Sequence, residues 1–454
     1  MFDLLRSPRR FLLFFFEGVL SAVLVVSAAC LRLGLHRGLV YPHIALKALL
    51  FSLFIQGSLY YAGFYDLAST RLPRVVFERV LRSAVLASVF LVGIFYIVPA
   101  LEIGRGIFLV AIALVALVVP AWRVLYNSVA ESAGGLRRTL ILGNGELAKE
   151  LATMMDSRAD LGMELVGMLA RDRAQMVPRS GVIGIYKELY DIVMRDHIQV
   201  VLVAYPDRRG TLPVEQLLEI KFRGVEVYEG VDFYEREMGK IFVRELKPSQ
   251  LIFAEGFTAR TTTRRLKRIM DVIVATLGII LSAPLMLLTA IAIRIESPGP
   301  FLYKQVRAGE FGKLFTILKF RSMRVDAEKH GAQFAKVNDD RITRVGQFIR
   351  KTRLDELPQF WNVLMGEMSM VGPRPERPEF VDDLAHEIPF YRARHAVKPG
   401  ITGWAQVRYG YGNTVDDART KLEYDLYYVR HAGFYLDSLI ALKTVSVVFK
   451  LQGK

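Results

Sequence analysis

Four long apolar runs occupy most of the first 130 residues, and they limit the possible folds of this part of the chain more than any other feature. The runs begin at Phe11, Ala45, Ser83 and Ile107. Each is close to the roughly 20 residues that a helix needs to cross the hydrocarbon core of a bilayer. The first run is too long for a signal peptide, and no small-residue cleavage site follows it. We therefore predict a four-helix transmembrane region over residues 1–130.

The positive charges around these runs indicate how the predicted bundle is oriented. They gather before the first run, between the second and third, and after the fourth, at Arg6, Arg9, Arg10, Arg71, Arg74, Arg79, Arg82, Arg123, Arg137 and Arg138. The two other connections are poorer, with Arg37 in one and Arg105 in the other. Because Lys and Arg accumulate on the cytoplasmic side of a membrane, we expect both ends of the bundle in the cytoplasm.

The composition fits a chain that is part membrane region and part polar domain. Hydrophobic residues make up 52% of the 454 residues, yet charged residues still make up 23%. The net charge of +15 suits nucleic acid, anionic lipid headgroups or phosphorylated substrates. Cys30 is the only cysteine, so the chain forms no intrachain disulfide.

Strand and helix patterns alternate from Arg137 onward, which predicts a parallel sheet with crossover helices. The expected strands are RRTLIL, ELVGMLA, IQVVLVAY and VEVYEG, with one helix after the first strand and another around residues 186–195. We predict a Rossmann-like middle domain over residues 137–251.

The turn after the first of these strands, Gly143-Asn-Gly145-Glu-Leu-Ala148, has the pattern G-x-G-x-x-A. In this context the pattern seats a pyrophosphate at a helix N-terminus. The equal alternative is a doubly wound domain that keeps the turn for packing. No Tyr-x-x-x-Lys pair occurs between residues 137 and 251, which disfavours catalysis by a sugar dehydratase or epimerase.

A fifth apolar run, residues 271–293, is also long enough to span a membrane. Basic residues flank it on both sides, which marks both ends as cytoplasmic, at Arg264, Arg265, Lys267, Arg268, Arg294, Lys304 and Arg307. Pro284 removes a helix hydrogen bond and bends the axis, and Ser282 can satisfy a freed carbonyl. We expect a re-entrant membrane helix over residues 266–294 that turns near Ser282 and Pro284, with a fifth spanning helix as the alternative.

Glycine and proline punctuate the next segment, SPGPFLYKQVRAGEFGKLFTILKFRSM, which predicts two strands joined by tight turns. Tyr303, Gln305 and Arg307 alternate along the first strand and either line a site or pack on the sheet. Lys319 and Arg321 end the second strand, where a strand would place them on one face. Both are candidate phosphate-binding residues, and a solvated face is the alternative.

Two adjacent acids, Asp355 and Glu356, follow in RKTRLDELPQFWNVLMG. Pro358 is tolerated in a helix only in the first turn, so a helix that begins at Leu354 or Asp355 has both acids at its N-terminus. There the unpaired N–H groups and the helix dipole keep a carboxylate ionised and favour a phosphate. An ordinary solvated helix start is the alternative.

Adjacent residues on a helix diverge by roughly 100°, so these two acids cannot easily share one proton. One is able to attack phosphorus while the other holds Mg²⁺, which commonly binds one or two carboxylates and substrate phosphates. Arg350 and Arg374 are candidates to clamp phosphoryl oxygens bidentately. Trp404, in the loop KPGITGWAQV, is a candidate to stack a uracil base, or belongs to a simple turn.

Several motifs resemble those of the bacterial sugar transferases, the polyprenyl-phosphate hexose-1-phosphate transferases. They are RRLKRIMDVIVA, ESPGPFLYKQVRAGEFGKLF, ILKFRSMRVDAE, DDRITRVGQFIRKTRLDELPQFWNVLMGEMSMVGPRPE and KPGITGWAQV, in this order, and they cover most of residues 264–410. The resemblance implies a monotopic catalytic domain of mixed α/β fold over residues 260–454, whose re-entrant helix is broken at Pro284.

The same resemblance implies roles for individual residues. Asp355 corresponds to the nucleophile and Glu356 to a ligand of Mg²⁺, while Arg350 and Arg374 match arginines that bind phosphate. Arg353 departs from the pattern, because relatives often carry a small residue there, and it adds positive charge near the acids.

The activity that the resemblance implies is transfer of hexose-1-phosphate from a UDP-sugar to undecaprenyl phosphate, with release of UMP, through a covalent aspartyl-phosphosugar intermediate. This step would initiate exopolysaccharide, capsule or O-antigen synthesis at the bacterial inner membrane, with the catalytic domain on the cytoplasmic face. Expected partners are the two substrates, membrane lipids and downstream glycosyltransferases of the same pathway, with a homodimer considered and no nucleic acid. Glucose or galactose is the first expectation for the sugar, with N-acetylated sugars open.

Three rival functions are weighed against this one. A regulatory or scaffold protein of polysaccharide export that binds nucleotide sugars would not need Asp355, Glu356, Arg350 and Arg374 together. A membrane-bound sugar-nucleotide dehydratase would need the Tyr-x-x-x-Lys pair. A nucleic-acid-binding protein would explain the net charge, but the cations follow the membrane ends and the phosphate site.

Overall fold

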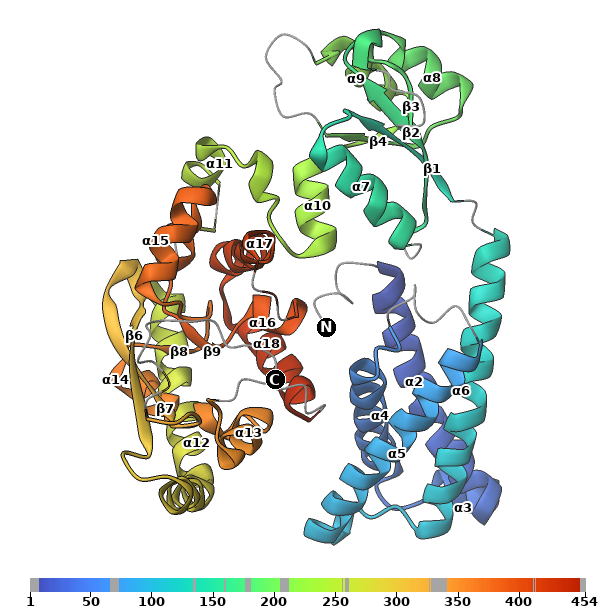
Figure 1. Ribbon diagram of the computed structural model, residues 1–454. Helices are drawn as coiled ribbons and strands as arrows, with labels where there is room; N and C mark the ends of the chain where they lie inside the picture. The colour runs from blue at the N-terminus through green and yellow to red at the C-terminus, as the bar shows by residue number, and fades with distance from the viewer. Residues whose placement is uncertain are drawn as a thin grey trace. The chain divides into compact units, whose positions relative to one another are not determined.

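The computed structural model describes residues 8–65, 73–133, 136–158, 161–175, 181–204, 212–254, 256–257, 261–325, 327, 341–410, 412 and 414–449 (Figure 1). The chain divides into two compact units, Met1–Phe233 and Tyr234–Lys454. Within the described residues, five helices are long and apolar enough to cross a membrane, and they are Phe11–Leu33, Ile44–Tyr61, Pro73–Ile97, Arg105–Val129 and Thr261–Glu296. The five apolar runs of the sequence are therefore all helical.

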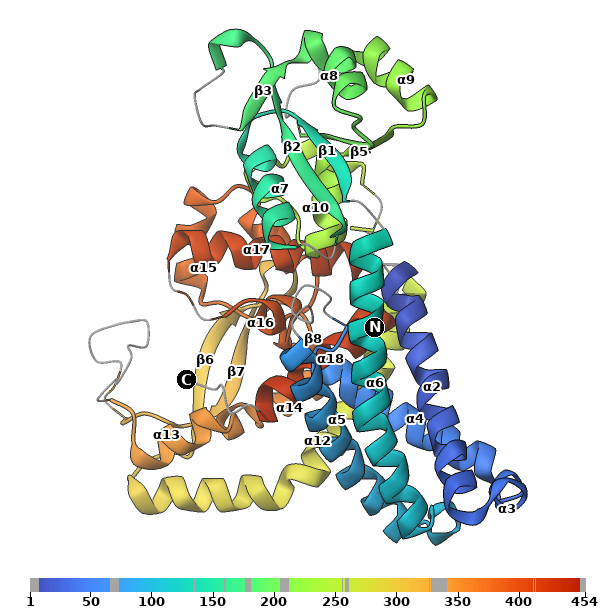
Figure 2. The same ribbon diagram turned by 90° about the vertical axis from the view of Figure 1, so that its right-hand side faces the viewer.

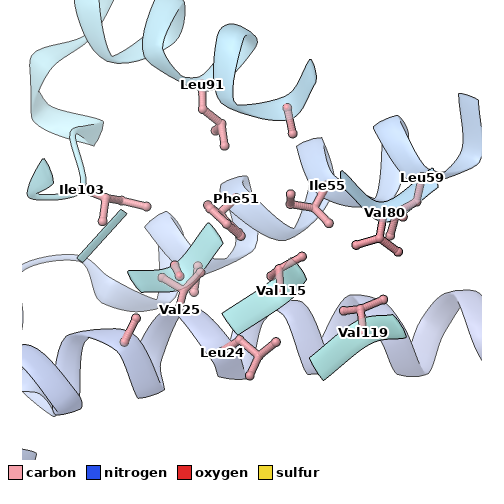
Figure 3. Close-up of a cluster of buried hydrophobic side chains, with 14 of the residues drawn as sticks. Leu24, Val25, Phe51, Ile55, Leu59, Val80, Leu91, Ile103, Val115 and Val119 are labelled. Atoms are coloured by element: carbon pink, nitrogen blue, oxygen red, sulfur yellow. The ribbon is translucent and has the colours of Figure 1, made fainter. Parts of the chain in front are cut away.

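The first unit begins with the predicted helical bundle. Its helices are α2 (Pro8–Leu33), the short α3 (Leu35–Leu39), α4 (Ile44–Tyr61), α5 (Pro73–Ile97) and α6 (Arg105–Ala133). Figure 3 shows the buried apolar side chains that hold the four long helices together, among them Val25 of α2, Phe51 of α4, Leu91 of α5 and Val115 of α6. The outward faces carry many exposed apolar side chains, as a lipid-facing bundle requires.

A buried ion pair joins the first and last long helices of this bundle. Arg123 of α6 lies 3.1 Å from the carboxylate of Glu17 on α2, and neither side chain is exposed. The guanidinium also stacks over the ring of Phe64 at 4.5 Å. The orientation argument from the sequence counted Arg123 among the charges that follow the fourth run. In the structure Arg123 lies inside α6 and pairs with Glu17, so it does not lie beyond the end of the helix.

Breaking this pair should destabilise the bundle strongly, because the remaining charge would be buried without a partner. We expect Arg123→Met to lower the free energy of unfolding by about 3–5 kcal/mol, and Arg123→Met with Glu17→Leu to recover much of that loss. Thermal unfolding in detergent measures both. The control is Arg74→Ala, which breaks the exposed Arg74–Glu78 pair and should change little. Equal losses in the single and double variants would contradict the expectation.

The rest of the first unit contains the predicted parallel sheet. Its strands are β1 (Arg137–Leu142), β2 (Met163–Ala170), β3 (Val182–Ile185), β4 (Val200–Val203) and β5 (Glu226–Glu229), in the order β3-β2-β1-β4-β5. Helices α8 (Leu189–Arg195) and α9 (Val214–Phe222) cover one face, and α7 (Glu146–Ser157) covers the other (Figures 1 and 2). The sequence did not predict β3, because its four residues include a glycine and are too few to show alternation.

The glycine turn of this domain has a packing role. Gly143 follows β1 with φ of 135°, a conformation that L side chains rarely adopt. A Cβ atom at this position would lie 2.1 Å from the carbonyl oxygen of Ala204, at the end of the neighbouring strand β4. Close approach of two strand ends therefore requires the glycine whether or not a nucleotide binds here.

The second unit combines helices with two small sheets. Its strands are β6 (Leu302–Ala308) and β7 (Leu314–Phe320), which are antiparallel, and β8 (Ser369–Val371) and β9 (Gly400–Thr402), which are parallel. Its helices include α11 (Pro248–Ile252), α12 (Thr261–Glu296), α13 (Arg344–Lys351), α14 (Gln359–Met365), α15 (Pro378–Glu387), α16 (Trp404–Arg408), α17 (Val415–His431) and α18 (Phe434–Phe449). The predicted strand pair and the two helical pieces around the acids are confirmed.

Helix α12 is sharply bent. One arm stands upright in Figure 1, and the other is seen end-on there and lies across the view in Figure 2. Pro284 lies inside this helix, where it removes one hydrogen bond. The hydroxyl of Ser282 donates to the carbonyl of Gly278 at 2.6 Å rather than to Ile280, four residues before the proline. Such back-bonding bends helices, so both residues favour a bend in the middle of the run.

Candidate active site

The two adjacent acids lie in a short 3₁₀ turn between two helices. This turn, η7 (Leu354–Glu356), follows α13, and Arg353 turns the chain into it with φ of 58°. The sequence predicted an α-helix that begins at Leu354 or Asp355. The structure begins α14 at Gln359 instead, with Pro358 as its N-cap. The acids therefore precede the helix by about one turn.

Glu356 is buried among three cations. Its carboxylate lies 3.0 Å from Arg374, 3.5 Å from Lys319 and 3.9 Å from Arg353, and the arginine at 374 also donates a hydrogen bond to it. Burial raises the pKa of Glu356, but these positive charges outweigh burial and lower the pKa to about 2. Glu356 is therefore ionised at any physiological pH. Arg353, singled out in the sequence as a departure from the family pattern, contributes to this state.

Asp355 has the opposite electrostatic environment. Its burial and the neighbouring negative charge of Glu356 raise the pKa of Asp355 to about 6, although Lys319, Arg374 and Arg350 act to lower it. The sequence argument expected both acids to stay ionised at a helix N-terminus. The structure agrees for Glu356, whereas Asp355 takes up a proton more readily than an ordinary aspartate.

The turn that carries Arg374 is held by two other arginines. Arg307 of β6 donates to the carbonyl of Pro375 at 3.1 Å, and Arg394 donates to the carbonyl of Arg374 at 3.2 Å. Arg394 is itself fixed by Asp425 of α17 at 2.7 Å, and both side chains are almost fully buried. This support fixes the backbone from which Arg374 reaches Glu356.

Sequence reasoning missed Arg394 and Asp425. Neither residue stands near the acids in the chain, and an isolated Arg and an isolated Asp on separate helices give no local signal. Their pairing becomes visible only when α17 packs beside the 3₁₀ turn Tyr391–Ala396.

A cavity of about 1850 Å³ opens over the acids. It exceeds the ~300–1,000 Å³ of a typical small-molecule site. Cationic side chains outnumber acidic ones in its lining, and the cations are Arg294, Lys304, Arg307, Lys319, Arg321, Arg324, Arg341, Arg350, Arg353, Arg374, Arg377, Arg394, Arg408 and Lys421. A cavity with this charge and volume suits a large polyanionic ligand such as a diphosphate.

The phosphate-binding residues predicted from the sequence all border the cavity, but they differ in what their side chains contact. Lys319, Arg350 and Arg374 line the cavity with the acids, as do Tyr303, Gln305 and Arg307. Arg321 also borders the cavity, but its guanidinium donates three hydrogen bonds to Ser297 and Pro298 and so holds the turn after α12. Its role in phosphate binding stays a prediction.

Trp404 is buried and does not face the cavity of the acids. Only 2% of the residue is exposed, its indole donates to the carbonyl of Gly239 at 2.7 Å, and its ring packs on Tyr427. The tryptophan therefore has a packing role, which neither the uracil-stacking nor the simple-turn interpretation of the sequence included.

The donor set of the site suits a metal that takes most of its ligands from substrate and water. No group of three or more His, Cys, Asp or Glu side chains with metal-binding spacing occurs in the described part of the chain. Asp355 and Glu356 are adjacent carboxylates at the cationic cavity. Mg²⁺ is usually bound by one or two carboxylates together with phosphates, so these residues fit it.

The five long apolar helices indicate a membrane protein, and the cavity combines two adjacent carboxylates with a cationic lining. Residues 262–451 match the family model described as bacterial sugar transferase, and residues 61–219 match one described as a CoA-binding domain, which fits the Rossmann-like sheet. The undecaprenyl-phosphate galactose phosphotransferase of Salmonella typhimurium is 30% identical over 362 residues, which are 74% of this chain and 73% of that protein. The chain belongs to the bacterial sugar transferase family.

Two further relatives match shorter parts. A UDP-N-acetylgalactosamine-undecaprenyl-phosphate N-acetylgalactosaminephosphotransferase of Aeromonas hydrophila is 54% identical over 183 residues, 40% of this chain and 43% of that protein. An undecaprenyl-phosphate glucose phosphotransferase of Komagataeibacter xylinus is 34% identical over 317 residues, 68% of this chain and 58% of that protein. The chain thus spans about half the length of these two relatives.

Because the pKa of Asp355 is raised, the stability of the protein should depend on the charge of this residue. The folded state disfavours the ionised form of Asp355, which costs free energy of folding once the group loses its proton. This cost is absent below about pH 4 and complete above about pH 6. We expect Asp355→Asn to stabilise the protein by about 1–2 kcal/mol at pH 7.5 and to change little at pH 4, in the presence of a chelator. Unfolding midpoints at the two pH values test this.

The control for that measurement is Asp382→Asn. Asp382 lies in an exposed pair with Arg392, so its replacement should have no comparable effect at either pH. A loss of stability in Asp355→Asn at pH 7.5 would show that the cations around the site outweigh its burial.

Proposed function

We propose that this protein transfers a sugar 1-phosphate from a UDP-sugar to undecaprenyl phosphate and releases UMP, as the first step in building a surface polysaccharide. The observation that carries the proposal is the pairing of Asp355 with a cation-bound Glu356 at a large cationic cavity. The relatives support the substrate class, since each is named as an undecaprenyl-phosphate sugar phosphotransferase.

The proposed chemistry has two steps at one carboxylate. A carboxylate oxygen of Asp355 attacks the phosphorus that carries the sugar, and the bond from that phosphorus to the UMP oxygen breaks. An oxygen of undecaprenyl phosphate then attacks the same phosphorus, and the carboxylate of Asp355 leaves. The products are UMP and a polyprenyl diphosphate sugar, and Asp355 returns to its first state.

The surrounding residues of the chain have distinct parts in this scheme. Lys319 and Arg374 hold Glu356 ionised and bring positive charge to the cavity that would attract phosphoryl oxygens, and Arg350 adds positive charge near Asp355. Glu356, with Asp355 beside it, would hold Mg²⁺, which when bound offsets the charge of two phosphates. The burial that raises the pKa of Asp355 also leaves its carboxylate poorly solvated, which favours attack once the proton is lost.

The bent helix α12 supports a location of the site at the membrane surface. Its two arms expose large apolar side chains such as Leu281, Leu287 and Leu288, and basic residues flank both ends. We infer that α12 is re-entrant, that the second unit lies on the cytoplasmic face of the inner membrane, and that basic residues draw in the lipid phosphate. A homodimer and contacts with downstream glycosyltransferases belong to the same proposal.

The reaction is tested with purified protein, Mg²⁺, undecaprenyl phosphate and UDP-sugars that carry N-acetylgalactosamine, glucose or galactose. We expect UMP release with at least one donor, and a gain of one sugar phosphate in the intact protein mass when the lipid is omitted. Asp355→Asn should abolish both signals, because the nucleophile is lost.

The matched control is again Asp382→Asn, an exposed acid in the same unit, which should react as the wild type does. A competent donor that is turned over without any adduct on the wild type, or a fully active Asp355→Asn variant, would refute the covalent route.

The re-entrant topology is tested by labelling single cysteines in a chain with Cys30 replaced. A membrane-impermeant maleimide should reach Thr261→Cys, at the first residue of α12, and Lys313→Cys, after α12, only from the cytoplasmic side. Glu102→Cys, between the third and fourth bundle helices, is the control that should react only from outside. Opposite sidedness of the two positions that flank α12 would show a spanning helix.

A further inference from the structure

The side chain of Asn362 connects the helix after the acids to the strand that carries Lys319. Asn362 lies in α14, six residues after Glu356, and is only 2% exposed. Its Oδ1 accepts a hydrogen bond from the amide of Leu318 at 3.0 Å, and its Nδ2 donates to the carbonyl of Thr316 at 2.7 Å. A second Nδ2 hydrogen bond goes to Glu367 at 2.7 Å.

These partners fix which way the amide points. Two oxygen acceptors face Nδ2, and one N–H donor faces Oδ1. A flipped amide would set oxygen against two oxygens and nitrogen against nitrogen, and would lose all three hydrogen bonds. Asn362 therefore bonds β7 as a neighbouring strand would, one donor and one acceptor to alternate residues.

Two cross-links then join the same two segments of chain. Strand β7 is paired with β6 along one edge, and Asn362 occupies the other edge at residues 316 and 318. The next residue, Lys319, reaches Glu356 at 3.5 Å. Residues 316–319 and 356–362 thus form a closed ring, tied at one point by the amide and at the other by the ion pair.

The ring explains how the flexible side chain of Lys319 is positioned toward Glu356. A lysine side chain has four rotatable bonds, and the position of its ammonium depends on the backbone beneath it. Packing of Phe315 and Ile317 and the pairing with β6 hold one side of β7, but the free edge has hydrogen bonds from Asn362 at residues 316 and 318. Without them, a shift of this edge would move the ammonium of Lys319 away from Glu356.

We propose that Asn362 is a positioning residue, which sets the separation of Lys319 from Glu356 and so prepares the site for phosphoryl transfer. The inference rests on the proposed transferase function. Asn362 touches neither substrate nor the reacting atoms, and it acts through the strand. Its loss should therefore slow the chemical step and leave substrate binding nearly unchanged.

The first test compares Asn362→Leu, close in volume but unable to bond β7, with the wild type in the full chain. We expect kcat to fall about 100-fold, the size of effect that a misplacement of about 1 Å produces, with KM changed less than about 3-fold. The control is Trp404→Phe, which also removes one buried hydrogen bond but lies away from β7. That variant should lose stability and keep kcat near the wild-type value.

A second test uses rescue, so the result does not depend on one variant that folds poorly. Asn362→Asp keeps the acceptor for Leu318 but sets a carboxylate oxygen against Thr316 and Glu367, which should lower kcat. Adding Glu367→Gln supplies a donor to that oxygen, and we expect part of kcat to return. A kcat of Asn362→Asp equal to that of the wild type would overturn the positioning role, because the hydrogen bond to Thr316 is lost in that variant.

A double-mutant cycle identifies Lys319 as the residue through which Asn362 acts. If it acts by aiming Lys319, then Asn362→Leu should lower kcat far less in a Lys319→Met background than in the wild type. Full additivity of the two losses, or a large KM effect with kcat unchanged, would overturn the inference.

The outcome for the wild type separates this inference from the proposed function. If the wild type releases no UMP from any donor, the transferase proposal falls and the positioning role falls with it. If the wild type is active while the Asn362 variants match Trp404→Phe in kcat, only the positioning role falls. Amide exchange at Leu318, which should be slow in the wild type and fast in Asn362→Leu, checks the hydrogen bond without any substrate.

Discussion

The site depends on the burial of one negative charge, that of Glu356. An ionised carboxylate removed from water loses several kcal/mol of solvation, which only close cations and hydrogen bonds repay. Arg374 and Lys319 supply them from two different parts of the chain, the turn after β8 and the end of β7. The requirement to hold Glu356 therefore brings those two segments together over the 3₁₀ turn and defines the floor of the cavity.

The cations that keep Glu356 ionised also make its electrostatic environment differ from that of Asp355. The cations lie closest to Glu356, so Asp355 experiences mainly burial and the charge of its neighbour, and its pKa rises where that of Glu356 falls. One set of cations thus gives the two adjacent acids different pKa values. Asp355 is therefore suited to act as an attacking group, and Glu356 is suited to carry a fixed negative charge.

The sequence predicted the parts of the fold that have local or repetitive signals. The apolar runs and the strand before Gly143 depend on neighbours in the chain, and both are confirmed. The helix start near the acids was placed too early, since α14 begins at Gln359. The burial of Arg123 and the arginine Arg394 escaped prediction, because their partners lie about 106 and 31 residues away. Sequence periodicity also gave no sign that Arg321 would face the turn after α12.

Helix α12 is fastened directly to the elements that carry the site. Arg268 of α12 donates to the carbonyls of Val363 and Leu364 at the end of α14, and Asp271 accepts from Ser369 and from the amide of Met370 in β8. Helix α14 follows Glu356, and β8 precedes the turn of Arg374. Because polar contacts from one helix hold both, the position of the two acids is fixed relative to α12.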